Sequence, residues 1–288
     1  MQIEALSQVI ISGVLVGFVY ALPAVGLSLI WGLMEIVNFA HGDFIMLGMY
    51  IVFWLWSLFN IDPLLGLPIA AILLFIVGAL TYRIIIKRVL HASMVTQIFA
   101  TFGLGIALRS SAQFLWSSNY RMIDNPVASG MFKIGKLVIG IPQLIAGVVA
   151  LAITLLLYIY ISYSETGRAL TATSENREVA ELMGIDTHRM FALGWGIGGA
   201  CVGASGALLA MYYYIYPEVG LMFGTISYIA VAFGGFGSFL GTFLAAVVLG
   251  IIQVAGSFYI STAYKLAFVY ALYLIVVISR PRGLFGRW

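Results

Sequence analysis

Long apolar stretches separated by short polar segments run through the whole chain. A helix needs about 20 mostly apolar residues to cross a bilayer. The stretches are apolar on every side and do not alternate, which favours membrane helices over the strands of a barrel. The stretch 225–258 is too long for one straight span, and its glycine-rich interruption predicts a broken helix or two short segments. The stretches lie near 8–33, 43–59, 64–86, 94–116, 141–163, 190–212, 225–258 and 264–280.

We therefore expect an all-α, polytopic integral membrane protein of eight to nine transmembrane helices with discontinuous helices, organised as one domain over 1–288. Composition agrees, because 62% of the residues are hydrophobic and only 9% are charged. A soluble protein carries about 25% charged residues, so an ordinary cytosolic enzyme, a disordered chain and a disulfide scaffold are all excluded. The net charge is only +3 and no basic run occurs, so the expected surroundings are a lipid bilayer and not nucleic acid.

Basic residues orient the chain, because cytoplasmic loops carry an excess of Lys and Arg. This rule predicts a cytoplasmic loop at 164–189, an extracellular loop at 117–140, an outside N-terminus and a cytoplasmic C-terminus. Arg121, Lys133 and Lys136 count against the outer position of 117–140. The first eight residues lack a basic region, so 8–33 is expected to be a retained helix and not a signal peptide. The three basic groups are Arg83, Lys87 and Arg88; Arg168, Arg177 and Arg189; and Arg280, Arg282 and Arg287.

Two patterns resemble nucleotide sites without being good matches. The run 130–137 almost spells a phosphate loop, but Leu137 replaces the Mg²⁺-binding Ser or Thr. The run 194–199 fits GxGxxG but lies within an apolar span, where small residues serve close helix packing. Histidines are far apart, carboxylates are not paired within the spans, and Cys201 is alone. We expect no enzyme activity, no metal site and no cofactor in this chain, so its task is to move or sense something.

The segment Glu35–Asp43 places polar residues between two apolar stretches. Polar groups at membrane depth are tolerated where they line a cavity or find partners. One interpretation is a discontinuous helix broken at Gly42, with Asp43 capping the next helix and Asn38 or His41 facing a pathway. The alternative is a short cytoplasmic turn with Asp43 as an ordinary N-cap.

A second segment, 234–246, is rich in glycine and small residues. Glycines permit a backbone break, and transporters place such breaks near the substrate. A plain packing hinge is the alternative. The candidate pathway residues here are Gly234, Gly235, Gly237 and Ser238.

The loop 164–189 is the most polar part of the chain. Its core, 167–184, is predicted to form one short amphipathic helix that ends at Gly184. Leu170, Thr173, Val179, Ala180, Leu182 and Met183 would form its apolar side. A surface connector and a helix that docks in a partner's groove both fit this pattern.

Taken together, these segments resemble the permease subunits of branched-chain amino acid ABC transporters. The resemblance begins with GLSLIWG at 26–32 and VNFAHGDF at 37–44. It continues through GRA at 167–169, the glycine-rich 194–206, GGFGSFLG at 234–241 and RPRGLFG at 280–286. It covers nearly the whole chain and is greatest to the shorter of the two permease subunits.

The resemblance implies ATP-driven uptake across the bacterial inner membrane. The partners would be a second related permease, two ATP-binding subunits that use ATP and Mg²⁺, and an external solute-binding protein. Arg168, Glu178, Ala180 and Gly184 would belong to the loop that docks on the ATPase, with Val179 standing where the common pattern has Ala. Asn38, His41, Gly42 and Asp43 would lie on the pathway.

The substrate stays open at this level, because related permeases import urea, amides or aromatic acids. An ion-coupled secondary transporter would need a buried carboxylate or histidine relay, for which Asp43 and His41 are the near candidates. A passive membrane scaffold is a further alternative.

Overall fold

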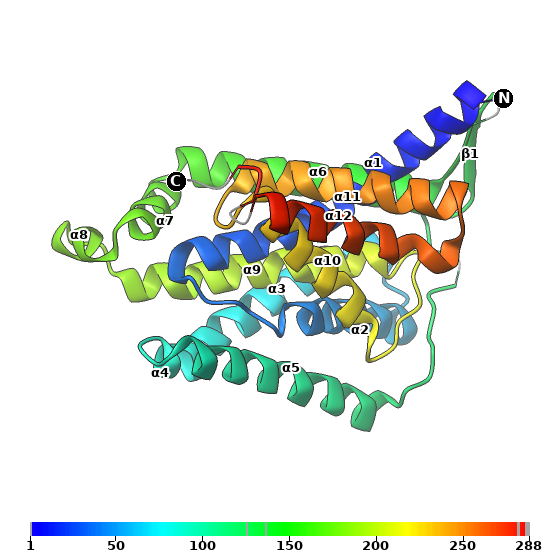
Figure 1. Ribbon diagram of the computed structural model, residues 1–288. Coiled ribbons are helices and arrows are strands. Elements are labelled where there is room, and N and C mark those ends of the chain that lie inside the picture. The colour runs from blue at the N-terminus through cyan, green and yellow to red at the C-terminus, as the bar shows by residue number, and fades with distance from the viewer. Residues whose placement is uncertain (1, 125, 136, 281–282, 286–288) are drawn as a thin grey trace.

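The computed structural model describes residues 2–124, 126–135, 137–280 and 283–285. Several residues of predicted features lie outside the described residues: Lys136 of the phosphate-loop-like run, Pro281, Arg282 and Gly286 of the terminal motif, and Arg287 of the third basic group. Helices run roughly side by side, and almost no sheet accompanies them (Figure 1). The all-α polytopic prediction is confirmed.

Eight helices of the described chain are long and apolar enough to cross a membrane. The stretch 225–258 forms two helices, so the predicted interruption is real. The helices are α1 Gln2–Met34, α2 His41–Phe59, α3 Pro63–Thr81, α4 Lys87–Val89, α5 Met94–Trp116, α6 Ile141–Tyr163, α7 Glu165–Glu175, α8 Arg177–Leu182, α9 Thr187–Leu209, α10 Val219–Gly234, α11 Phe239–Tyr259 and α12 Lys265–Ser279. A π-helical turn, Tyr82–Ile86, joins α3 to α4, and a 3₁₀ turn, Thr262–Tyr264, precedes α12.

The segment 117–140 contains a β-hairpin that the sequence analysis did not predict. Strands β1 Met131–Ile134 and β2 Leu137–Gly140 pair antiparallel, with Met131 opposite Gly140. The side-chain amide of Gln8 donates to the Val138 carbonyl at 2.7 Å and accepts from the Val138 amide at 2.9 Å. The hairpin is therefore fixed to the first turns of α1, and four residues of the phosphate-loop-like run, Met131–Ile134, form a strand.

Helix α9 occupies the middle of the bundle, and its glycines bring it against its neighbours. A Cβ on Gly199 would lie 2.1 Å from the Leu74 carbonyl oxygen of α3, and one on Gly203 would lie 2.5 Å from that of Ala70. Lipid tails are as apolar as leucine, so membrane helices associate mainly through such close packing. The prediction that the run 194–199 serves close helix packing is thus confirmed, and the contact continues to Gly203.

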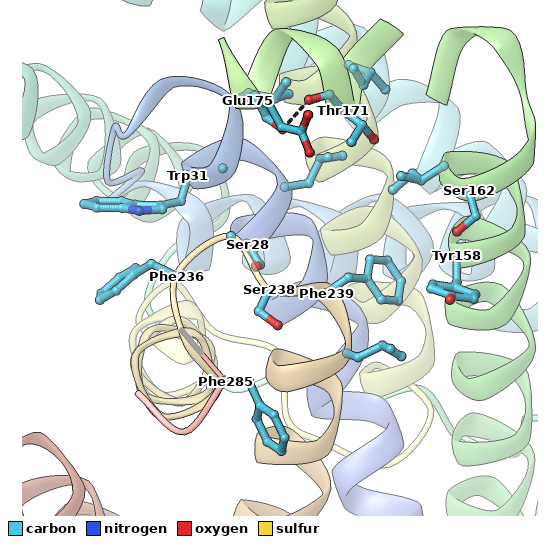
Figure 2. A pocket seen from close by; sticks show the side chains of 18 of the residues that line it. Ser28, Trp31, Tyr158, Ser162, Thr171, Glu175, Phe236, Ser238, Phe239 and Phe285 are labelled. Atoms are coloured by element: carbon cyan, nitrogen blue, oxygen red, sulfur yellow. Dashed lines mark hydrogen bonds between the residues drawn. The ribbon is translucent and has the colours of Figure 1, made fainter. Parts of the chain in front are cut away.

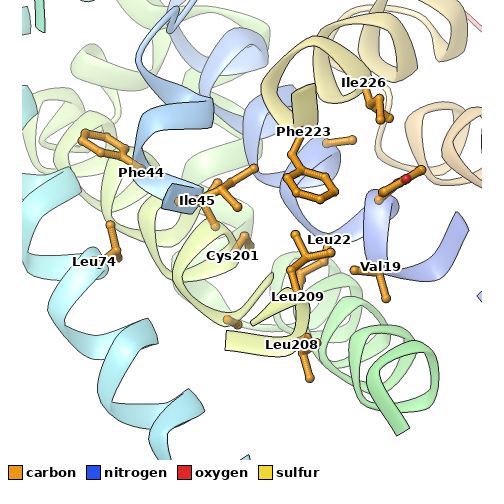
Figure 3. Packing of buried hydrophobic residues seen from close by; sticks show 14 of the residues in the cluster. Val19, Leu22, Phe44, Ile45, Leu74, Cys201, Leu208, Leu209, Phe223 and Ile226 are labelled. Atoms are coloured by element: carbon orange, nitrogen blue, oxygen red, sulfur yellow. The ribbon is translucent and has the colours of Figure 1, made fainter. Parts of the chain in front are cut away.

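The buried core gathers side chains of α1, α2, α3, α9 and α10 around this stripe (Figure 3). Cys201 is buried and free, and its Cβ lies close to Gly26 of α1. By contrast, α5 runs along one edge of the bundle (Figure 1). Its buried side faces α2, and much of its remaining surface is exposed. The bundle therefore has a tightly packed centre and a more open α5 edge.

Replacing Gly199 with Ala tests the close packing of α9. We expect a loss of about 1–3 kcal/mol, because the new methyl group must displace backbone of α3. Thermal unfolding of the purified protein in detergent measures the change. Gly103→Ala on α5 is the matched control, since its Cβ would meet nothing within 4 Å. Equal melting temperatures for the two variants would contradict the packing assignment.

Candidate functional site

A non-helical segment, 35–40, separates α1 from α2. The Glu35 amide still donates to the Trp31 carbonyl at 2.7 Å, but its φ of 55° turns the backbone into the left-handed region and ends α1. Helix α2 then begins at His41. The prediction of a break at Gly42 is wrong, because Gly42 lies in the first turn of α2. Asp43 is not a cap either, since Ala40 occupies the N-cap without a side-chain bond.

The segment 37–43 runs along α5. The Thr101 hydroxyl donates to the Val37 carbonyl at 3.0 Å, and a Cβ on Gly105 would lie 2.5 Å from the Asp43 carboxylate. Thr101 and Gly105 lie well inside α5. Helix α2 therefore begins beside the middle of α5 and not at the end of the bundle. The discontinuous helices of transporters also begin or end within the bundle.

Asp43 forms an ion pair with Arg109, a residue of α5. Nε of Arg109 donates to Oδ1 of Asp43 at 3.0 Å, and Nη2 donates to Oδ2 at 3.2 Å. The Asp43 side chain is 2% exposed and that of Arg109 is 21% exposed. Arg109 was not among the residues predicted for the site. Its signal was an arginine well inside the apolar stretch 94–116, where a charge is costly without a partner.

Asn38 and His41 are buried beside this pair. Nε2 of His41 lies 2.8 Å from the Pro23 carbonyl of α1, so Nε2 carries the proton and Nδ1 is left as an acceptor. Oδ1 of Asn38 accepts from the Ala40 amide, and the Asn38 carbonyl accepts from the Tyr228 hydroxyl at 2.7 Å. Nδ2 of Asn38 and Nδ1 of His41 have no hydrogen-bond partner among the described residues.

Gly42 lets α10 pack directly on the first turn of α2. A Cβ on Gly42 would lie 2.2 Å from the Gly220 carbonyl oxygen and 3.0 Å from the Gly224 Cα. The first turn of α2 is therefore enclosed by α1, α5 and α10. Of the predicted pathway residues, Asn38, His41, Gly42 and Asp43 do lie together, and all four are buried.

The glycine-rich segment forms the tight connection between α10 and α11. A Cβ on Gly234 would lie 2.4 Å from the Gly241 backbone, so the two helices cross where they nearly touch. Gly235 and Gly237 have φ values of 103° and 76°, which only glycine adopts without strain. Ser238 caps α11 by accepting from the Gly241 amide at 3.2 Å.

The C-terminal segment is bound to the same connection. The Leu284 and Phe285 amides donate to the Phe233 and Gly234 carbonyls at 2.9 and 3.2 Å. Gly283 has a φ of 80°, and a Cβ there would lie 2.6 Å from the Gly235 nitrogen. The glycine-rich segment and the terminal motif are therefore one structural unit.

A cavity of about 750 Å³ opens beside this unit. Figure 2 shows Ser28 and Ser238 near one another in it, with Trp31 and Phe236 on one side and Tyr158 and Phe239 on the other. Gly237 and Ser238 line this cavity, whereas Asn38, His41 and Asp43 do not. The structure therefore does not bring the two predicted groups of pathway residues into one site.

The polar loop 164–189 forms two helices and not the single helix predicted. Asn176 breaks the helix, because its backbone is extended and its side chain caps α8 through the Val179 amide at 3.0 Å. Ser164 caps α7 in the same way through the Gly167 amide at 2.9 Å. Gly184 ends α8 as predicted, with a φ of 83°, while the Ile185 amide donates to the Ala180 carbonyl at 3.0 Å.

The predicted apolar side of this loop is divided between two surroundings. Leu170, Thr173 and Ala180 are buried against the bundle. The others project outward from α8, with Leu182 87% exposed and Met183 77% exposed. Arg168 and Glu178 are exposed as well.

A hydrogen bond from Thr187 to Glu181 holds α8 against the start of α9. The Thr187 hydroxyl and then Arg177 hold the pKa of the Glu181 carboxyl below its usual range. The corresponding distances are 2.6 Å from Thr187 and 3.1 Å from Arg177. Helix α8 thus presents exposed apolar side chains from a fixed support.

Comparisons with known proteins agree with this architecture. A family model described as the permease component of branched-chain amino acid transport systems matches residues 9–277. The chain belongs to this permease family. The high-affinity branched-chain amino acid permease LivH of Escherichia coli is 31% identical, with 97% of this chain and 95% of LivH aligned.

Two further permeases show a similar extent of alignment. BraD of Pseudomonas aeruginosa is 29% identical, over 97% of this chain and 95% of its own. The probable LivH permease of Methanocaldococcus jannaschii is 27% identical, over 92% of this chain and 88% of its own. The comparison with solved structures found no significant match.

Gly283→Val tests the unit formed by the glycine-rich segment and the C-terminal segment. We expect faster hydrogen exchange at the Leu284 and Phe285 amides, because valine is strained at a positive φ and its side chain would meet the Gly235 nitrogen. Exchange measured by mass spectrometry in detergent reports this change. Gly135→Val in the hairpin turn is the control, since it combines a positive φ with open space. Unchanged hydrogen exchange in Gly283→Val would contradict the assignment of the two segments to one structural unit.

Proposed function

We propose that this chain is a transmembrane permease subunit of an ATP-driven importer for branched-chain or other hydrophobic amino acids. It would form the translocation pathway with a second, related permease in the bacterial inner membrane. An external solute-binding protein would deliver the substrate, and two ATP-binding subunits that use ATP and Mg²⁺ would dock on 164–189. The observation that carries the docking is the exposed apolar side of α8, held rigidly at one end of the bundle.

The described members of the three basic groups lie at this same end, which supports its assignment to the cytoplasm. The Tyr82 hydroxyl and Nδ1 of His188 are 2.7 Å apart, which places the Arg83–Arg88 region beside the start of α9. Phe285, which follows Arg280, lines the same cavity as Glu175 of α7. The N-terminus and the hairpin lie at the opposite end (Figure 1). Under the positive-inside rule, that opposite end faces outward.

The two short helices form a mechanical link between an ATPase and the spans. A Cβ on Gly167 would lie 2.2 Å from the Ile161 carbonyl oxygen, so α7 rests directly on the end of α6. Leu170 is buried against the bundle. Movement of α8 would therefore be passed to α6 and α1 as a rigid-body tilt and not absorbed by a flexible loop.

An ion-coupled secondary transporter is less consistent with this geometry. The carboxylate of Asp43 is already neutralised by Arg109, and Nε2 of His41 is bonded to the Pro23 carbonyl. Neither group is arranged as a proton relay with the other. Asn38, His41, Gly42 and Asp43 remain our proposal for one wall of the pathway. Gly234, Gly235, Gly237 and Ser238 remain our proposal for a second, separate part of it, next to the cavity.

Leu182→Asp tests the docking surface. A charge on this exposed apolar residue would be buried unpaired in the ATPase groove. We therefore expect that the ATPases no longer co-purify with the variant and that its uptake rate falls by about tenfold or more. Co-purification in detergent and uptake by proteoliposomes measure both effects.

Val127→Asp is the matched control for Leu182→Asp. Val127 is 84% exposed, similar to Leu182, and its amide is bonded to the Asp62 side chain at the far end of the bundle. We expect normal ATPase association in this control. Full retention of the ATPases by Leu182→Asp would count against docking on α8.

A further inference from the structure

Arg109 and Asp43 belong to a row of polar residues within an otherwise apolar part of the bundle. Helices α5 and α10 both pack on α2. Gln113 of α5 is hydrogen bonded to Glu218, which precedes α10, one turn beyond the Arg109–Asp43 pair. On the other side of the pair lies Tyr228 of α10, whose hydroxyl donates to the Asn38 carbonyl. Polar groups thus follow one another along the surface shared by α5, α2 and α10.

This surface is unsuited to lipid. The other basic residues of the candidate spans 63–89 and 187–209, Arg83, Lys87, Arg88 and Arg189, lie toward the span ends, whereas Arg109 lies well inside α5. A charged residue exposed to hydrocarbon is costly, so intramembrane arginines face water-filled cavities or protein partners. The 21% exposure of Arg109 therefore indicates that an aqueous pathway or the second permease covers this surface.

The pair retains unused binding capacity. Only Nε–H and one Nη2–H of Arg109 are bonded to Asp43, and a guanidinium carries further N–H donors. Arg109 is the outer member of the pair, and Asp43 lies behind it. If Arg109 turns toward a bound carboxylate, Asp43 loses its partner and is available to a cation. A solute with both charges would therefore replace the internal pair without leaving a charge unpaired.

Exposed apolar side chains lie on the same helix as Arg109 and in the segment just before Asp43. Phe102 and Ile106 of α5 are 50% and 46% exposed. Spacings of seven and three residues place them on the same side of the helix as Arg109. Phe39 is 37% exposed and its ring lies 5.6 Å from that of Tyr228. These residues offer an apolar contact for a solute's side chain.

We propose that Arg109 and Asp43 form a subsite for the carboxylate and the ammonium of a free amino acid with an apolar side chain. Arg109 binds the carboxylate, Asp43 binds the ammonium, and Phe39, Phe102 and Ile106 contact the side chain. The subsite selects zwitterionic amino acids over urea and amides, which carry no opposite charges to replace the pair. This rests on the proposed function, because it assigns a substrate class to that pathway.

The double variant Asp43→Asn with Arg109→Gln tests this subsite. Asn has the shape of Asp, and Gln, although shorter than Arg, keeps a side-chain N–H donor. The double variant leaves no unpaired buried charge, so a role that needs only a neutral polar pair would survive. The complete transporter, with its partner permease and ATPases, is reconstituted, and its binding protein delivers labelled leucine. We expect normal assembly and a normal melting temperature, but a rate of leucine uptake that is lower by about tenfold or more.

Lys133→Gln removes one exposed positive charge from the hairpin and serves as the control, with wild-type uptake expected. Leucine uptake by the double variant at the wild-type rate would overturn the subsite and leave the proposed function intact. A wild-type transporter that imports neither leucine nor any other apolar amino acid would overturn the proposed function as well. The two failures are therefore distinguishable.

Photolabelling of the wild-type transporter tests the subsite without any variant. Photo-leucine keeps both charges of leucine, and we expect it to label peptides of α5 and of the first turn of α2. Excess leucine should suppress this label, whereas leucinamide, which lacks the carboxylate, should not. Labelling confined to other helices, or equal suppression by leucinamide, would overturn the proposal.

Discussion

Backbone groups without partners are expensive in hydrocarbon, and this constraint decides where the bundle can be interrupted. Helix α2 begins beside the middle of α5, where its first turn lies inside the protein. Three neighbours enclose it, and the side-chain oxygen and the carbonyl of Asn38 both accept hydrogen bonds, from the Ala40 amide and the Tyr228 hydroxyl. Gly42 and Gly220 bring the first turn of α2 and the start of α10 into backbone contact, which leaves no room for lipid between them. The polar residues near Asp43 are tolerated because of this enclosure.

The same constraint explains the connection between α10 and α11. Two helix ends meet there, and the C-terminal segment satisfies the carbonyls of Phe233 and Gly234. Glycine is required at Gly235 and Gly237 by the positive φ values, and at Gly234 by the close approach to Gly241. Both interruptions are thus built from glycine contacts, but they line different spaces. One adjoins the ion pair on α5, and the other adjoins the cavity near α7.

Much of the helical architecture was readable from the sequence, because apolar length and glycine spacing are local properties. The split of 225–258, the packing role of 194–199 and the end of α8 at Gly184 all follow from residues close in sequence. Contacts between distant residues were not readable. Arg109 is 66 positions from Asp43, and only the fold brings them together. The hairpin was missed because its contact with Gln8 is also long-range. The single helix predicted over 167–184 was wrong because the Asn176 side chain caps α8, and this capping competes with continuation of the helix.

The central claim is that this chain provides a pathway whose motion is driven by separate ATP-binding subunits. Reconstitution in proteoliposomes tests it most directly, with the permease pair assayed alone and then together with the ATPases and the binding protein. We predict accumulation of leucine against its gradient only when the ATPases and ATP are present. Accumulation by this chain alone, driven by an ion gradient and abolished by an uncoupler, would contradict the account.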